Sequence, residues 1–87
     1  MKVLIIEDDA KILGYVANGL VEAGHTVDTA TDGEMGLHFA SSEKYDVIIV
    51  DRMLPKVEGL EIIKTLRGTG NLTAVLILSS LGDVDHR

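Results

Sequence analysis

The fold of this chain is decided by one stretch, Asp46-Val47-Ile48-Ile49-Val50-Asp51-Arg52-Met53-Leu54-Pro55. Its central residues, Val47 to Val50, are all apolar and β-branched, which is typical of a strand buried on both faces in a parallel sheet. The strand runs directly into a carboxylate, Asp51, and then into a turn that contains Pro55. Ligands of open α/β sheets bind outside the carboxyl ends of the strands, so Asp51 is predicted to lie where chemistry is done.

The hydrophobic pattern on either side predicts three further strands and three helices. The strands are expected at residues 2–6, 26–30 and 73–78, and the helices between 9 and 24, from 33 to about 40, and from 58 to 67. Asp9 is the expected N-cap of the first helix, and Gly36 weakens the prediction of the second. Leu60, Ile63 and Leu66 are expected in the core. Alternating strands and helices predict the α/β class with a parallel sheet and right-handed crossovers.

Composition narrows the class of protein. The 87 residues carry a net charge of -6. Nucleic-acid binding requires a surface rich in lysine and arginine, so no direct nucleic-acid contact is expected for this segment. The absence of cysteine excludes disulfides and thiolate zinc sites. The apolar run after Lys2 is too short for a signal peptide or a membrane span, so a cytoplasmic protein without membrane contact is expected. Tyr15 and Tyr45 are interpreted as amphipathic packing residues.

Polar side chains suited to one site follow three of the predicted strands. Glu7 and Asp8 follow the first, Asp51 the third and Ser79 the fourth. Crowded carboxylates repel one another unless a hard cation neutralises them, and Mg²⁺ prefers such oxygen ligands. With Asp51 as the oxygen nucleophile, the pattern indicates a metal-assisted phosphoryl site of the aspartyl-phosphate type.

Two other classes of function compete with a phosphoacceptor module. A metal-dependent phosphatase or phosphotransferase would carry a second acid two residues after its nucleophile, but Met53 occupies that place, and the usual proton donor is missing. The other alternative is a fragment without phosphorylation chemistry that acts by dimerisation or strand exchange. Single acids at strand ends also often do no more than cap helices or solvate loops.

These residues closely resemble the receiver domain family of response regulators. The resemblance rests on Glu7-Asp8, on Asp51 within the run Asp-x-Met-Leu-Pro-x-x-x-Gly that ends at Gly59, and on Ser79. It implies a flavodoxin-like fold with strand order 2-1-3-4-5. Within the family, the amino-acid sequence is similar to the OmpR/PhoB class, in particular to its metal-responsive regulators.

The resemblance also implies a role for each site residue. Asp51 would accept a phosphoryl group from a sensor histidine kinase, without the chain being an enzyme in the ordinary sense. Asp8, Asp51 and the backbone carbonyl of Met53 would bind Mg²⁺, and Glu7 would act through a metal-bound water. Ser79 would be the switch hydroxyl, and the output, transcription, would come from a C-terminal DNA-binding domain outside this sequence.

The match is to a partial receiver domain over residues 1–87, because the fifth strand and fifth helix of the family have no counterpart in the sequence. The family's lysine after the fifth strand and the aromatic residue on it are therefore missing as well. The strand at 73–78 is then expected to present an apolar edge that recruits another strand. A homodimer is expected through this edge or through exchanged C-terminal elements.

Overall fold

The structure, a computed structural model, describes residues 1–51 and 59–78, so the features expected at Met53, Pro55 and Ser79 lie outside it. Strands and helices alternate along the described chain. In order they are β1 (Lys2–Ile6), α1 (Ala10–Glu22), β2 (Thr26–Ala30), α2 (Gly33–Ser42), β3 (Val47–Asp51), α3 (Gly59–Gly68) and β4 (Ala74–Leu78). The predicted α/β class is confirmed.

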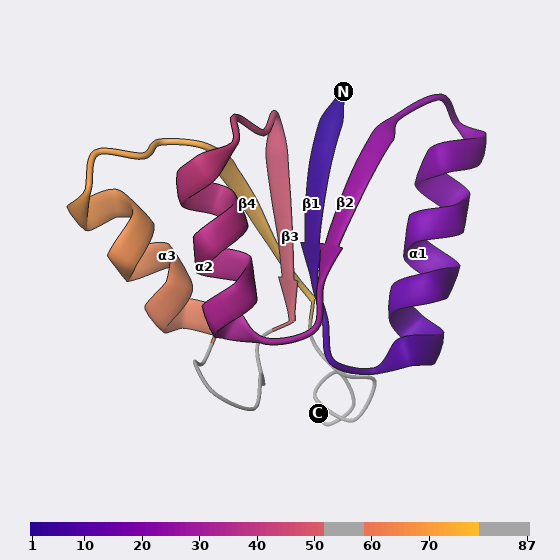
Figure 1. Ribbon diagram of the computed structural model, residues 1–87, viewed down its shortest axis with the longest axis horizontal. Coiled ribbons are helices and arrows are strands. Elements are labelled where there is room, and N and C mark those ends of the chain that lie inside the picture. The colour runs from indigo at the N-terminus through magenta and orange to yellow at the C-terminus, as the bar shows by residue number, and fades with distance from the viewer. Residues whose placement is uncertain (52–58, 79–87) are drawn as a thin grey trace, which may run out of the picture.

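The described strands form a single parallel sheet in the order β2-β1-β3-β4 (Figure 1). This order agrees with the first four strands of the expected 2-1-3-4-5 arrangement. Because all strands run the same way, their carboxyl ends lie along one edge of the sheet. Because β1 and β3 are neighbours, with Ile6 paired to Val50, the carboxyl ends of these two strands lie side by side at that edge.

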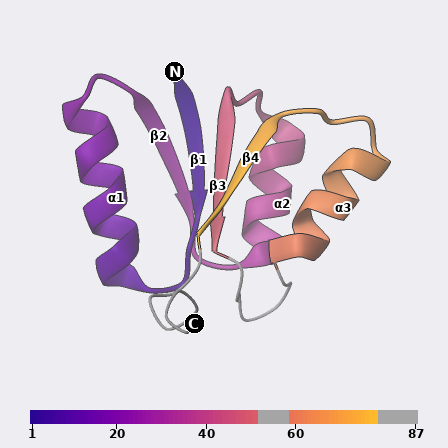
Figure 2. The same cartoon turned by 180° about the vertical axis from the view of Figure 1, so that it is seen from behind.

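The sheet separates two apolar layers. Figures 1 and 2 show α1 on one face of the sheet and α2 with α3 on the other. Alternate residues of β1 divide between the layers: Val3 and Ile5 pack towards α1, whereas Leu4 and Ile6 join the cluster beneath α2 and α3. All four side chains are almost fully buried. The sheet is therefore held rigidly from both sides where β1 ends.

Residues at the two ends of α1 explain where this helix begins and ends. The Asp9 carboxylate accepts the backbone N–H groups of Lys11 and Ile12 at 2.9 and 3.2 Å, which confirms Asp9 as the N-cap of α1. Gly24 follows the helix with a φ of 96°, in the left-handed region that glycine adopts at little cost. The second helix extends to Ser42, two residues beyond the expected end.

The helical phase of α3 differs from the expectation. Leu66 is 2% exposed, as predicted for the core, but Leu60 is 48% exposed and the prediction for it was wrong. Ile62, which lies four residues before Leu66 and so on the same face of the helix, is fully buried instead. Tyr15, expected to pack, is 83% exposed on α1.

Strand β4 is the least covered of the apolar strands. It pairs with β3 alone among the described strands, and Leu76 is 59% exposed. Leu76 is paired with Ile49, so both side chains lie on the same face of the sheet. This is the face on which α1 packs, but α1 lies over β1 and β2. No helix within residues 1–51 and 59–78 has the length and apolar character needed to cross a membrane.

Candidate metal centre

The topology brings together the acids that follow β1 and β3. Ile6 is paired with Val50, so Glu7 and Asp8 emerge beside Asp51 at the carboxyl end of the sheet. Carboxylate oxygens from these three residues all lie within 4.8 Å of one another. The predicted cluster of Glu7, Asp8 and Asp51 is therefore present in the structure.

The three carboxylates differ in exposure. Glu7 is 2% exposed, Asp51 is half-buried and Asp8 is exposed. The cluster thus extends from the interior of the sheet to the surface. A ligand arriving from solvent reaches Asp8 and Asp51 first, with Glu7 behind them.

Glu7 is fixed by two hydrogen bonds. Its backbone N–H donates to the carbonyl of Ala30 at the end of β2, over 3.0 Å. Its Oε2 accepts the backbone N–H of Asp9, also over 3.0 Å. The main chain and the side chain of Glu7 are both held before any ligand arrives.

The electrostatics of the cluster favour a cation. The pKa of Glu7 is raised to about 7, chiefly by burial and also by the neighbouring Asp51 and Asp8 carboxyl groups, while the N–H of Asp9 opposes the shift. A bound divalent cation would offset this repulsion and favour the ionised form of Glu7. Since all three donors are carboxylate oxygens, the set fits Mg²⁺, which takes oxygen ligands and is commonly held by one or two carboxylates.

Two of the predicted site residues lie outside the described part of the chain. These are Met53, expected to offer its carbonyl, and Ser79, expected to offer its hydroxyl. Ser79 directly follows Leu78, which is paired with Asp51 across β3 and β4. The structure adds one contact that sequence reasoning missed: the Asp9 N–H on Glu7. Asp9 was predicted only as a helix cap.

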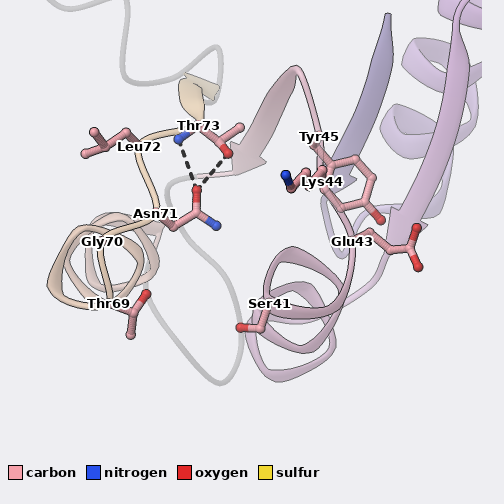
Figure 3. A pocket seen from close by; sticks show the side chains of 9 residues that line it. All are labelled: Ser41, Glu43, Lys44, Tyr45, Thr69, Gly70, Asn71, Leu72 and Thr73. Atoms are coloured by element: carbon pink, nitrogen blue, oxygen red, sulfur yellow. Dashed lines mark hydrogen bonds between the residues drawn. The ribbon is translucent and has the colours of Figure 1, made fainter.

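A separate cavity of about 650 Å³ lies at the opposite end of the sheet (Figure 3). It is formed by the segment between α2 and β3 and by the segment between α3 and β4, including Lys44, Tyr45 and Asn71. The Asn71 Oδ1 accepts the N–H and the hydroxyl of Thr73 at 3.0 and 2.7 Å, so this amide is used to shape the loop. None of the residues that line the cavity belongs to the cluster of Glu7, Asp8 and Asp51.

Fold and site together define an α/β protein with a carboxylate cluster at the carboxyl end of a parallel sheet. Residues 3–87 match the family model of the response regulator receiver domain. The chain belongs to this family. The predicted family membership is confirmed.

Two similar proteins are named as transcriptional regulatory proteins. The chain is 48% identical over 87 residues to the probable transcriptional regulatory protein SilR of Salmonella typhimurium and 45% identical to the transcriptional regulatory protein CusR of Escherichia coli K12. In each case the match covers 100% of this chain and 38% of the relative. The chain therefore spans well under half the length of these relatives.

Solved structures support the same assignment. The receiver domain of the Francisella response regulator 1452 superposes with a TM-score of 0.89 at 36% identity, over 97% of this chain and 69% of that one. The response regulator TrrA of Thermotoga maritima, in complex with Mg²⁺ and BeF, gives a TM-score of 0.87 at 27% identity, over 97% and 73%. The described part of the chain thus has the receiver fold.

Proposed function

We propose that Asp51 is the phosphoacceptor of a two-component relay and that Glu7, Asp8 and Asp51 form its Mg²⁺ site. The observation that carries the proposal is the convergence of three carboxylates within 4.8 Å at the end of β1 and β3. Asp8, Asp51 and the Met53 carbonyl would hold the cation directly, and Glu7 would hold it through water. When bound, the cation would supply positive charge beside the incoming phosphoryl group.

The reaction is a transfer between two nucleophiles. An oxygen of Asp51 attacks phosphorus in the phosphohistidine of a sensor kinase, the P–N bond breaks, and its electron pair remains on the imidazole. Asp51 suits this role because it is half-buried at the strand end, where a phosphoryl donor can reach it, whereas Glu7 is enclosed, at 2% exposed. The chain is an acceptor that takes part in its own phosphorylation and dephosphorylation, not an enzyme acting on other substrates.

The phosphoryl signal is passed on through the rest of the protein. We assign the switch hydroxyl to Ser79, because it follows the residue of β4 that pairs with Asp51. The names of the two relatives support a transcriptional output in the whole protein, through a DNA-binding region beyond this segment. A cytoplasmic location is part of the same proposal, since the kinase and the output would both act there.

The test of the proposed chemistry is intact-mass analysis after incubation with a small-molecule phosphodonor and Mg²⁺. We expect an acid-labile gain of one phosphoryl group in the wild type and none in Asp51→Asn or without Mg²⁺. Asp46→Asn is the matched control: it also removes a carboxylate next to β3, but at the far end, where Asp46 Oδ2 accepts the N–H of Lys2 at 2.7 Å. Absence of phosphorylation in the wild type would refute the phosphoacceptor role.

A second proposal concerns assembly. We infer that two copies associate through β4, because this strand is apolar, lies at the edge of the described sheet and exposes Leu76. The opposite edge strand, β2, carries Asp28 and two threonines and is less suited to pairing. If phosphorylation fails while pairing occurs, the alternative of a fragment that acts by dimerisation or strand exchange is favoured.

A further inference from the structure

The connection from the metal site into helix α1 runs through Asp9. Its backbone N–H donates to Glu7 Oε2 at 3.0 Å, so this N–H helps to orient the buried carboxylate. Glu7 cannot be held in the same way by solvent, since it is only 2% exposed. The Asp9 N–H is thus a fixed donor behind the metal site.

The Asp9 side chain ties the backbone at Asp9 to the first turn of α1. Asp9 has the extended conformation of an N-cap, with φ of -81° and ψ of 112°. Its Oδ1 accepts the N–H groups of Lys11 and Ile12 at 2.9 and 3.2 Å, which fixes the backbone of Asp9 against the first turn of α1. Asp9 itself is exposed.

Helix α1 is in turn anchored to the sheet. Its inner residues Leu13, Val16 and Leu20 pack against the cluster of Val3, Ile5 and Ile49. The N-terminal turn of α1 therefore has a defined position relative to the ends of β1 and β3. A rigid element supports a metal ligand more accurately than a free loop does.

From these contacts we propose that Asp9 is a positioning residue of the metal site, acting through its helix-capping side chain and its backbone N–H on Glu7. The inference rests on the proposed Mg²⁺ site. Partners that orient metal ligands typically change metal affinity by about 10- to 100-fold when they are lost. Loss of the cap loosens Asp9, so Glu7 no longer presents a fixed carboxylate to the cation and its bound water.

Two substitutions separate the cap from the charge. Asp9→Asn and Asp9→Ala remove the same negative charge, but asparagine caps helices well and alanine does not. By calorimetric titration of the 87-residue chain with Mg²⁺, we expect Asp9→Ala to bind about tenfold more weakly than Asp9→Asn. Without Mg²⁺, the amide proton at position 9 should exchange about fivefold faster in Asp9→Ala, as expected for the loss of one cap.

Gly24→Ala is the control for a general weakening of α1. It strains the other end of the helix, where Gly24 has a φ of 96° and an added Cβ would meet nothing within 4 Å, and it leaves Asp9 unchanged. It should lower stability and leave Mg²⁺ affinity unchanged. Equal Mg²⁺ affinity of the two Asp9 variants, equal amide exchange in them, or a matching loss of affinity in Gly24→Ala would each overturn the role of Asp9. A wild-type chain that binds no Mg²⁺ would overturn the metal site as well.

Discussion

Gly36 of α2 lies directly on the side chain of Ile6 at the end of β1, leaving no room for a Cβ atom on Gly36. Ile6 precedes Glu7, and both residues are buried. The close approach of α2 to β1 therefore depends on the missing side chain at position 36. From the sequence alone, Gly36 is only an interruption of the helix. In the structure, the glycine is required for packing beneath the metal site.

Gly36→Ala is expected to destabilise the chain by about 1–2 kcal/mol, because overpacking of the core outweighs the better helix propensity of alanine. Urea unfolding measures the change. Gly19→Ala is the matched control in α1, where a Cβ meets nothing within 4 Å, and it should gain up to about 1 kcal/mol. Ile6→Val should cost less in the Gly36→Ala background than in the wild type. Additive effects of the two substitutions would contradict the contact.

The stability of the metal-free chain should fall as pH rises from about 5 to 8. The pKa of Glu7 is raised to about 7, chiefly by burial, so the folded state holds a proton that the unfolded state has already lost. Stability is full below the ordinary glutamate pKa and is lost as pH rises through the folded value, by on the order of 2 kcal/mol. Urea midpoints in a chelator buffer measure this loss.

Glu7→Gln is the matched variant for the pH experiment, because it keeps the size of the side chain and cannot ionise. It should flatten the profile and be more stable than the wild type at pH 8 without metal. Saturating Mg²⁺ should restore stability to the wild type at high pH, since a cation favours the ionised carboxylate. The same pH slope in wild type and variant would show that Glu7 is not the group responsible.

The sequence was sufficient to predict which acids meet at the ends of the strands. It was not sufficient to predict which side chains are buried by contacts between separate elements. Glu7, Asp8 and Asp51 were predicted to meet because parallel strands share one edge, and this required no side-chain detail. Leu60 was wrongly assigned to the core, since its helix face is chosen by packing against the sheet and not by hydrophobicity. The fit of Gly36 against Ile6 was equally inaccessible, because it is a contact between separate elements.

Tyr45 and Asp28 show a further contact that no local pattern indicates. The Tyr45 hydroxyl donates to Asp28 Oδ2 at 2.7 Å, and the tyrosine is 7% exposed. Burial and the neighbouring Asp28 raise the pKa of Tyr45. Tyr45→Phe should therefore cost about 2 kcal/mol of stability through the lost charge-assisted hydrogen bond.

The matched control is Tyr15→Phe, which removes a hydroxyl from a residue that is 83% exposed and should change stability by less than about 0.5 kcal/mol. Tyr45 lines the cavity at the end of the sheet opposite the acids (Figure 3). Phosphorylation of Asp51 in Tyr45→Phe should consequently match the wild type while the chain is folded. A loss of phosphorylation without unfolding would mean that the two ends of the sheet are coupled.

The edge strand gives the last prediction. If copies of this chain pair through β4, Leu76→Lys should shift the chain from dimer to monomer, because charged side chains on an edge oppose strand pairing. The cost to folding should be small, since Leu76 is 59% exposed. Analytical ultracentrifugation over a range of concentrations measures the change.

Leu72→Lys is the control: Leu72 is 80% exposed but precedes β4, so this variant should associate like the wild type. A wild-type chain that is monomeric at every concentration, or equal association of both variants, would exclude pairing through β4.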